Sequence, residues 1–341
     1  MKQRRHSVRL VTDALLGRLP DEADWPTLLQ IANRGWLVPA LYVALRHYDQ
    51  LHQIPPPVSD YLSFLHSRNC ERNLRLRRQL LEATTALNAA GVEPILLKGA
   101  VHLFTAADDD LGARMLSDLD ISVGPVEMAR TRSALGALGY EAHGNARELA
   151  RTQDAAVIEL HDRPSARSAR YLTGDLKACS PKTVRDGAVA RIPSATARSL
   201  HLLVHDMIKE GDYWSFKLDL RHLYDLAGLA RSEPGVDWQT LSEVLSDGVA
   251  RDALAVQARA LEDLFAIEIP AGLCAGRQAQ HRHSARLICA SGGPAAPVVR
   301  LVGNLSCGVR KFSQGYTWAG GRKFGLQVSR QIFTRGSGSR V

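Results

Sequence analysis

Two aspartates, Asp118 and Asp120, stand in a short segment where the apolar residues Leu119, Ile121 and Val123 alternate with polar ones. This period of two predicts a strand with one aliphatic face. Residues two apart on a strand point to the same side, so both carboxylates should emerge together. Two like charges this close repel each other unless a cation lies between them, and a ligand set made only of oxygens favours Mg²⁺. The segment therefore predicts a metal-binding strand.

A phosphate-binding turn is predicted just upstream of this strand. Residues 95–97 form an apolar run typical of a buried strand, Lys98-Gly99 follows, and a helical pattern begins at Ala100. Free N–H groups and the dipole at a helix start attract an anion. Gly99 allows the backbone to approach closely, and Lys98 adds a positive charge. Arg114, shortly before the acidic strand, supplies a second positive group.

This ordered set of features resembles a known group of enzymes. Leu97-Lys98-Gly99-Ala100, then Arg114, then Ser117-Asp118-Leu119-Asp120-Ile121 are similar to the uncharacterised bacterial nucleotidyltransferase family proteins of the DNA polymerase β-type nucleotidyltransferase superfamily. The resemblance covers roughly residues 20–265. It implies an α+β fold in which a small mixed β-sheet carries helices on one side.

The resemblance also implies a reaction and its site residues. Two Mg²⁺ ions, or Mn²⁺ in their place, would be held by three carboxylates, and a nucleotidyl group would be transferred from an NTP, with ATP as the expected donor. Asp118 and Asp120 would bridge the two metals. The nucleotide would be bound by residues of the glycine turn, Lys98 and Gly99, and by residues just before the acidic strand, Arg114 and Ser117.

Ala100 departs from the superfamily pattern. Most members place a serine after the glycine and use its hydroxyl on a terminal phosphate, whereas an alanine offers no hydroxyl. Lys98 then has to provide more of the phosphate contact. The identity of the donor and of the transferred group therefore stays open.

A two-metal site needs a third carboxylate near the attacking oxygen. Glu159 lies in an apolar strand-like run and matches the third acid of the superfamily, and His161 lies on the same strand face. A solvent-facing glutamate on an edge strand is the alternative interpretation, and Asp154 and Asp162 are the alternative third acids. Positioning and charge neutralisation would then carry the reaction, because phosphoryl-type transfers need little covalent chemistry from the protein.

The composition is that of an ordinary globular protein. The 341 residues are 45% hydrophobic and 23% charged, which predicts a sizeable core and two or three domains. The sequence contains no run of about 18 apolar residues, so we expect no transmembrane helix. The basic N-terminus lacks the apolar stretch of a secretory signal. Five scattered cysteines predict reduced thiols. We therefore expect a cytoplasmic enzyme.

Breaks in the pattern divide the chain into four expected regions. A helical N-terminal region spans residues 1–91, the nucleotidyltransferase-like core spans 92–194, and a second helical region spans 195–269. A basic, Gly/Arg-rich extension spans 270–341, and we expect it to be partly disordered. The long helix predicted near the end of the first region has an arginine-rich middle that is expected to face solvent (Arg68, Arg72, Arg75, Arg77 and Arg78).

The second helical region contains further candidate residues for the cleft. His201 and His205 lie four residues apart and share a helix face. No His-Glu-x-x-His pattern accompanies them, so we expect a packed or hydrogen-bonded pair beside the nucleotide instead of a transition-metal site.

Lys217 comes just before a helix that contains Asp219, Arg221, His222 and Asp225 and resembles one following the core in this group. Such residues would contact the nucleotide or the acceptor. Arg221 and Asp225 on this helix are four residues apart. An intrahelical ion pair between them is the alternative interpretation.

The positive charge is concentrated at the C-terminal end. Residues 271–341 contain eleven Lys and Arg and no Asp or Glu, whereas the whole chain has a net charge of +8. The rest of the chain is therefore slightly acidic, and nucleic acid is not an expected partner. Three interpretations of the extension stay open: a disordered segment, a segment that docks on an acidic partner, acceptor peptide or anionic membrane surface, and a segment that binds nucleic acid by charge and stacking.

Two classes of function follow. The first is Mg²⁺-dependent transfer of a nucleotidyl or related phosphate-linked group to a small-molecule or peptide acceptor, in a biosynthetic tailoring step. The second is a non-catalytic or antitoxin-like regulatory protein that uses the same fold to bind or modify a partner protein. The presence of all three candidate acids favours the enzyme. The acceptor and the oligomeric state stay open.

Overall fold

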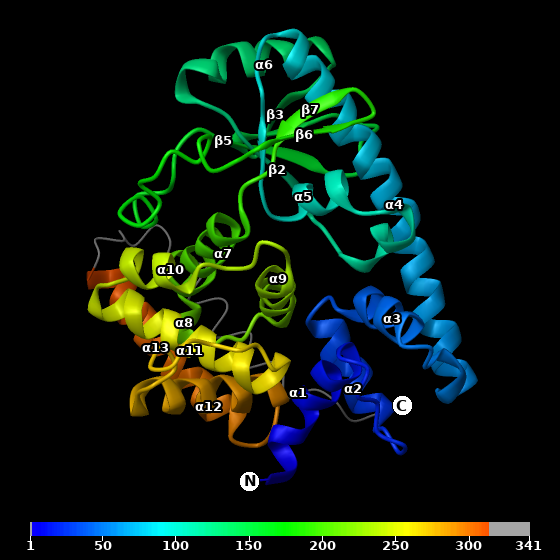
Figure 1. Ribbon diagram of the computed structural model, residues 1–341, viewed down its shortest axis with the longest axis vertical. Coiled ribbons are helices and arrows are strands. Elements are labelled where there is room, and N and C mark those ends of the chain that lie inside the picture. The colour runs from blue at the N-terminus through cyan, green and yellow to red at the C-terminus, as the bar shows by residue number, and fades with distance from the viewer. Residues whose placement is uncertain (1, 314–341) are drawn as a thin grey trace, which may run out of the picture.

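The computed structural model describes residues 2–313, which form a sheet-containing half and a helical half. In Figure 1 the sheet half lies at the top and the helical half at the bottom. The long helix α4 (Pro56–Ala89) runs down one side and reaches both.

A single mixed sheet of seven strands forms the sheet half, in the order β3-β4-β5-β2-β1-β7-β6. β2 pairs in parallel with β5, and β1 pairs antiparallel with β2 and parallel with β7. The other three pairs are antiparallel. The prediction of an α+β fold with a mixed sheet is confirmed. The strands are β1 (Ile95–Leu96), β2 (Asp118–Ser122), β3 (Glu141–His143), β4 (Asn145–Ala150), β5 (Val157–His161), β6 (Lys182–Arg185) and β7 (Ala188–Arg191).

The sheet half has its own apolar core. Leu119 and Ile121 of β2 are fully buried in it, as the alternating pattern predicted. Leu80 of α4, Val101 of α5 and Leu135 of α6 pack in the same core. This packing fixes the backbone of β2 and so the direction of the polar side chains between its apolar ones. The helices and turns of this half are α5 (Lys98–Thr105), η2 (Asp108–Ala113), η3 (Pro125–Glu127) and α6 (Met128–Ala137).

The helices before and after the sheet half share a second apolar core. Leu28 and Leu41 from the N-terminal region pack together with Leu223 and Phe265 from the later region. The two helical flanks are therefore joined through one core below the sheet. Their elements are α1 (Lys2–Leu15), α2 (Trp25–Arg34), α3 (Val38–His47), η1 (Leu51–Gln53), α7 (Ala195–Leu203), η4 (Val204–Glu210), α8 (Asp212–Ser215), α9 (Leu220–Arg231), α10 (Trp238–Val244) and α11 (Gly248–Phe265).

The bounds of α4 follow from its proline and glycine residues. The helix begins at Pro56, because a proline is tolerated in the first turn, where its missing N–H has no helical partner. Gly91, just past the end of the helix, has a φ of +71°, a left-handed conformation that stops helices.

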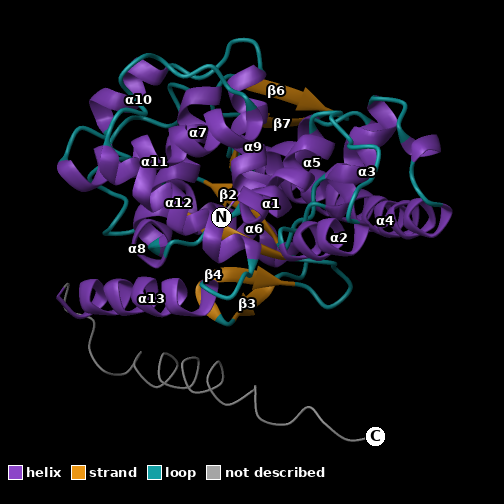
Figure 2. Ribbon diagram, turned by 90° about the horizontal axis from the view of Figure 1, so that it is seen from below, coloured by secondary structure: helices purple, strands orange, loops and turns teal. Residues whose placement is uncertain are grey.

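Two further helices lie within the residues that were expected to form a basic extension. α12 (Arg277–Ser291) packs against α11 and buries His283 and Arg286, and α13 (Ala296–Ser313) lies along one edge of the molecule in Figure 2. Residues 314–341 lie outside the described residues, so the expected disorder there stays a prediction. Within residues 2–313, we find no helix with the length and apolar character needed to cross a membrane.

Candidate active site

The three predicted acids lie on one face of the sheet. Asp120 of β2 stands directly opposite Glu159 of the parallel strand β5, and Asp118 is two residues earlier on β2. All three line a cavity of about 240 Å³ between the sheet half and the helical half. Asp120 is 1% exposed, whereas Asp118 and Glu159 are half-buried. Ser117, which directly precedes Asp118, donates to Asp118 Oδ1 at 3.0 Å. We call the surface formed by Asp118, Asp120 and Glu159 the acid wall.

Lys98 and His161 both contact the buried acid. Lys98 Nζ lies 2.8 Å from Asp120 Oδ1, and His161 Nε2 lies 2.9 Å from the same oxygen. Burial opposes the charge of Asp120, but the hydrogen bond from His161 and the charge of Lys98 outweigh it and hold the pKa of Asp120 far below its usual range. Burial also opposes the charge of Lys98, yet Asp120 raises the pKa of Lys98. Both groups of the pair therefore stay charged.

The Lys98-Gly99 turn has an unexpected geometry. Lys98 itself has a φ of +46°, in the left-handed region that favours glycine. A Cβ on Gly99 would lie 2.2 Å from Leu116 Cδ2 and 2.4 Å from Arg114 Nη1. Gly99 is therefore needed because the turn packs closely against the segment before β2. A contact between its backbone and a phosphate would be a second reason for a glycine here. Strained backbone of this kind is concentrated at functional sites.

Arg114 joins the two halves of the molecule through a partly buried ion pair. Its Nη2 lies 2.7 Å from Asp225 Oδ2 of α9, and its Nε lies 3.1 Å from both carboxylate oxygens. Burial opposes both charges, but the pairing outweighs it, raising the pKa of Arg114 and lowering the pKa of Asp225. The alternative of an intrahelical pair with Arg221 is wrong, because Asp225 bonds Arg114 and Arg221 lies 4.9 Å from the centre of the Trp36 ring.

Polar side chains of α4 hold the segment that leads into the acid wall. Asn69 and Asn73 donate to the carbonyl oxygen of Arg114 at 3.1 and 2.8 Å. Arg72 and Arg77 donate to other carbonyl oxygens of residues 103–116. The prediction of a solvated arginine face is therefore wrong for Arg72 and Arg77. Their guanidinium groups supply hydrogen bonds to backbone oxygens of this segment, which folded proteins rarely leave buried without a donor.

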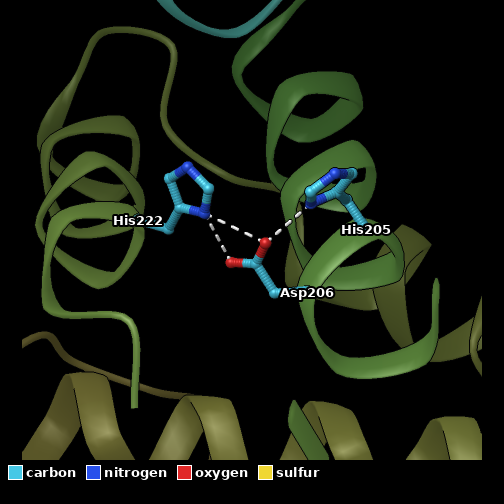
Figure 3. Close-up of side chains that lie close together, drawn as sticks. All are labelled: His205, Asp206 and His222. Atoms are coloured by element: carbon cyan, nitrogen blue, oxygen red, sulfur yellow. Dashed lines mark hydrogen bonds and ion pairs between the residues drawn. The ribbon is translucent and has the colours of Figure 1, made fainter. Parts of the chain in front are cut away.

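A second cluster of a carboxylate with histidines lies on the helical wall of the same cavity. His205 and Asp206 belong to the π-helical turn η4, and His222 belongs to α9. His205 Nδ1 lies 2.8 Å from Asp206 Oδ1, and His222 Nδ1 lies 2.8 Å from Asp206 Oδ2 (Figure 3). His205 and His222 line the cavity together with Lys209 and Arg221. We call this surface the histidine wall. Single π-helical turns are rare and frequently occur at functional sites.

The buried carboxylate of Asp206 fixes both imidazoles. Burial opposes its charge, but the hydrogen bonds from His205 and His222 outweigh it and hold the pKa of Asp206 well below its usual range. Burial lowers the pKa of His222, but the hydrogen bond and the charge of Asp206 outweigh burial, so the pKa of His222 is raised. Because each ring turns Nδ1 toward Asp206, each Nε2 is directed elsewhere. The sequence pointed to His205 and placed His222 on a helix expected to contact the nucleotide or the acceptor, but it did not indicate Asp206, whose only local signal is a common His-Asp dipeptide.

The remaining predicted residues lie in other places. His201 lines a second, larger cavity, where burial and the charge of Lys98 lower its pKa to about 3 and keep it neutral. Asp219 accepts from the backbone N–H of His222 at 3.1 Å and so caps α9. Lys217 Nζ lies 3.6 Å from Asp219 Oδ2. Lys217 and Asp219 are not among the described residues that line the acid-wall cavity.

A comparison with known protein families bears directly on this geometry. The family model described as uncharacterised nucleotidyltransferase matches residues 21–266, which include both walls of the cavity. The chain belongs to this family. No curated protein and no solved structure matches the chain. The resemblance seen in the sequence is confirmed, and membership of the nucleotidyltransferase family supports nucleotidyl transfer as the general activity.

The acid wall offers ligands that suit the divalent cation expected for a nucleotidyltransferase. Single ligand atoms of Asp120, Glu159 and His161 lie within 4.8 Å of one another, and Asp118 stands on the same strand face. Mg²⁺ prefers carboxylate oxygens, and the contact with Lys98 shows that Asp120 already stabilises a positive charge here. The donor set therefore fits Mg²⁺. Ligand atoms of the histidine wall also lie within 4.8 Å of one another, but both oxygens of Asp206 bond imidazoles, so we assign no metal there.

Proposed function

We propose that this nucleotidyltransferase moves a nucleotidyl group from an NTP, with ATP as donor, to a small-molecule or peptide acceptor in a cytoplasmic tailoring step. Asp118, Asp120 and Glu159 would hold Mg²⁺, with Mn²⁺ as a substitute. One observation carries the proposal: three carboxylates from adjacent parallel strands line a cavity whose opposite wall presents Lys209 and Arg221. A polyphosphate in this cavity would lie between metal-binding oxygens and cations.

The transfer forms one bond to the α-phosphorus and breaks another. A hydroxyl oxygen of the acceptor attacks the phosphorus, its proton leaves, and pyrophosphate departs with the electrons of the broken P–O bond. When bound, Mg²⁺ neutralises charge on the phosphoryl oxygens and on the leaving group. Lys98, in the same cavity as the acids, offers its ammonium to phosphate oxygens, while Lys209 and Arg221 bind the polyphosphate from the helical wall.

His205 is our candidate for the group that accepts the proton of the acceptor. Its Nδ1 bonds Asp206, so the neutral ring carries its proton there and presents a lone pair at Nε2. Within residues 2–313, the ionic neighbour of His205 Nε2 is Glu210, with its Oε1 at 3.7 Å, whereas Nε2 of His222 lies 3.1 Å from Arg221 Nη2. Asp206 acts on this step only by holding the ring.

The test uses the purified protein with Mg²⁺, each of the common NTPs, and the small-molecule and peptide fraction of a cell extract. We expect Mg²⁺-dependent release of pyrophosphate and an acceptor whose mass rises by one nucleotidyl group. The double substitution Asp118→Asn with Asp120→Asn should abolish both signals while the circular dichroism spectrum is unchanged. Asp109→Asn, at an exposed position outside the cavity, is the matched control. Normal turnover in the double variant would refute the proposal.

A further inference from the structure

A second cavity of about 510 Å³ adjoins the acid-wall cavity and shares Lys98 and Arg114 with it. Helices α1, α5, α7 and α9 contribute to its walls, so it lies where the sheet half meets the helical half. Its volume is within the roughly 300–1,000 Å³ of small-molecule sites. Much of the lining is aliphatic, with leucines from several elements (Leu15, Leu16, Leu97, Leu176, Leu202 and Leu229).

The charges in this lining are unbalanced. Two histidines line the cavity, and burial, helped by neighbouring positive charges, lowers the pKa of both, so they carry no charge near neutral pH (His102 and His201). The lining residues that are charged comprise four cations and a single carboxylate among the described residues (Lys98, Arg114, Arg198, Arg231 and Asp225). The cavity is therefore positively charged.

Three of the four cations already have partners. Lys98 bonds Asp120, Arg114 bonds Asp225, and Arg231 donates to the backbone carbonyl of residue 265. The guanidinium of Arg198, in contrast, has no hydrogen bond and no ion pair within 4.0 Å among residues 2–313. The negative charge that acts on it belongs to Asp225, which Arg114 already binds in a bidentate pair.

An arginine side chain stays protonated in a protein, so Arg198 keeps its charge although burial lowers its pKa. A partly buried guanidinium without a counter-charge is unfavourable, and it becomes favourable when an anion arrives. The leucine walls are unsuited to a polyphosphate, which needs many donors. The ligand that satisfies both features has one anionic group and an apolar body.

We propose that this cavity binds an anionic small molecule with an apolar body, whose carboxylate or phosphate pairs with Arg198. The cavity meets the acid wall at Lys98, so a ligand held at Arg198 extends toward the site of transfer. On the proposed function this ligand is the acceptor. Binding itself does not depend on catalysis, so the site is tested without nucleotide or metal.

The experiment is calorimetric titration of the full chain with octanoate, octyl phosphate, octanol and octylamine, which share one hydrocarbon body and differ in the head group. We expect the two anions to bind, octanol to bind more weakly, and octylamine not to bind. The tighter of the two anions identifies the natural head group as carboxylate or phosphate. Arg198→Met should weaken binding of the anions about tenfold or more and leave octanol unchanged. Arg75→Met, at an exposed position of α4, is the matched control.

A second variant tests the place of binding. Gly228 lines the cavity, and no atom lies within 4 Å of the position that its Cβ would take. Gly228→Phe therefore fits the backbone and fills ligand space, and it should reduce binding of octanoate and octanol alike, whereas Gly228→Ala should not. Equal binding of all four probes, no binding of any, or unchanged anion binding in both Arg198→Met and Gly228→Phe would overturn the proposal. Selective anion binding with no nucleotidyl transfer would contradict the proposed function and leave the cavity site standing.

Discussion

The acid wall and the histidine wall use the same pair of chemical groups for different purposes. Each is built around a buried carboxylate that accepts hydrogen bonds from histidine, and in each case the pKa of the carboxyl is held far below its usual range. Asp120 has further carboxylates beside it, Asp118 and Glu159, and the ammonium of Lys98. Asp206 has two imidazoles and no second acid in direct contact among the described residues.

This difference indicates which of the two walls can bind a cation. The acid wall has more carboxylates than its lysine and histidine can neutralise, so it gains from a divalent ion. On the histidine wall both oxygens of Asp206 are occupied, and the exposed surface carries cations and imidazole nitrogens. We therefore expect substitutions on the acid wall to affect the reaction first, and substitution of Asp206 to affect folding first.

The largest effect is expected from Asp120→Asn. The amide keeps the size of the side chain and can accept from Lys98, but it removes the charge that would hold Mg²⁺. Transfer should fall by about 10²–10³-fold or more, as for the loss of a main electrostatic contact in an active site. Rates of pyrophosphate release over a range of Mg²⁺ concentrations measure this. Full activity at saturating Mg²⁺ would show that Asp120 is not needed for the chemistry.

Asp206→Ala should have the largest effect on folding. It leaves His205 and His222 without the buried acceptor that joins η4 to α9, and loss of one partner of a buried charged pair costs about 3–5 kcal/mol. Urea unfolding followed by circular dichroism gives the change in the free energy of unfolding. Asp60→Ala on the exposed face of α4 is the control. If both variants unfold at the same urea concentration, Asp206 has no structural role and the contrast between the walls fails.

The sequence was sufficient for the elements whose evidence is local. Alternation over residues 118–123 predicted a strand with Asp118 and Asp120 on one side, and the apolar run after residue 154 predicted the strand that carries Glu159. The first prediction rests on a period of two, which packing of one face against a core imposes on a strand, and the second rests on a short run of apolar residues. The register that places Asp120 opposite Glu159 required the structure.

The sequence was insufficient for contacts made across long separations. Arg77 looked like a surface residue, because nothing nearby in the chain shows that the carbonyl oxygens of residues 103 and 106 need donors. Asp225 looked like a partner for Arg221, because helical spacing is visible in a sequence and a pair with Arg114 is not. Asp206 was missed for the same reason, since its role depends on His222 from another helix.

Gly99→Ala tests how the packing of the Lys98-Gly99 turn supports the acid wall. The added methyl would meet Leu116 and Arg114, so either the segment before β2 shifts or the helix start does. Overpacking of this kind costs about 1–3 kcal/mol, and transfer should fall because Arg114 belongs to the displaced segment and Asp118 follows directly after it. Gly136→Ala on α6 is the matched control, since no atom lies within 4 Å of its Cβ position, and it should stabilise the helix by about 0.5–1 kcal/mol. Equal stability of the two variants would mean that close packing does not require Gly99.

The smallest effect is a dependence of stability on pH that belongs to the histidine wall. The folded-state pKa of His222 is raised above its ordinary 6.5, so its pairing stabilises the fold fully below about pH 6.5 and less as the pH rises through the folded pKa. The pKa of Asp206 is lowered from 3.8, so the stability that Asp206 contributes is present above about pH 3.8 and is lost only in stronger acid.

The experiment compares the free energy of unfolding of the wild type with that of His222→Gln. This difference should be largest between about pH 3.8 and pH 6.5 and shrink toward about pH 9. Lys98 and Asp120 stay charged over this interval, so their pair should add no such slope. Urea unfolding of both proteins across this pH interval measures the difference, and a difference that is constant with pH would mean that His222 is not protonated against Asp206 in the folded state.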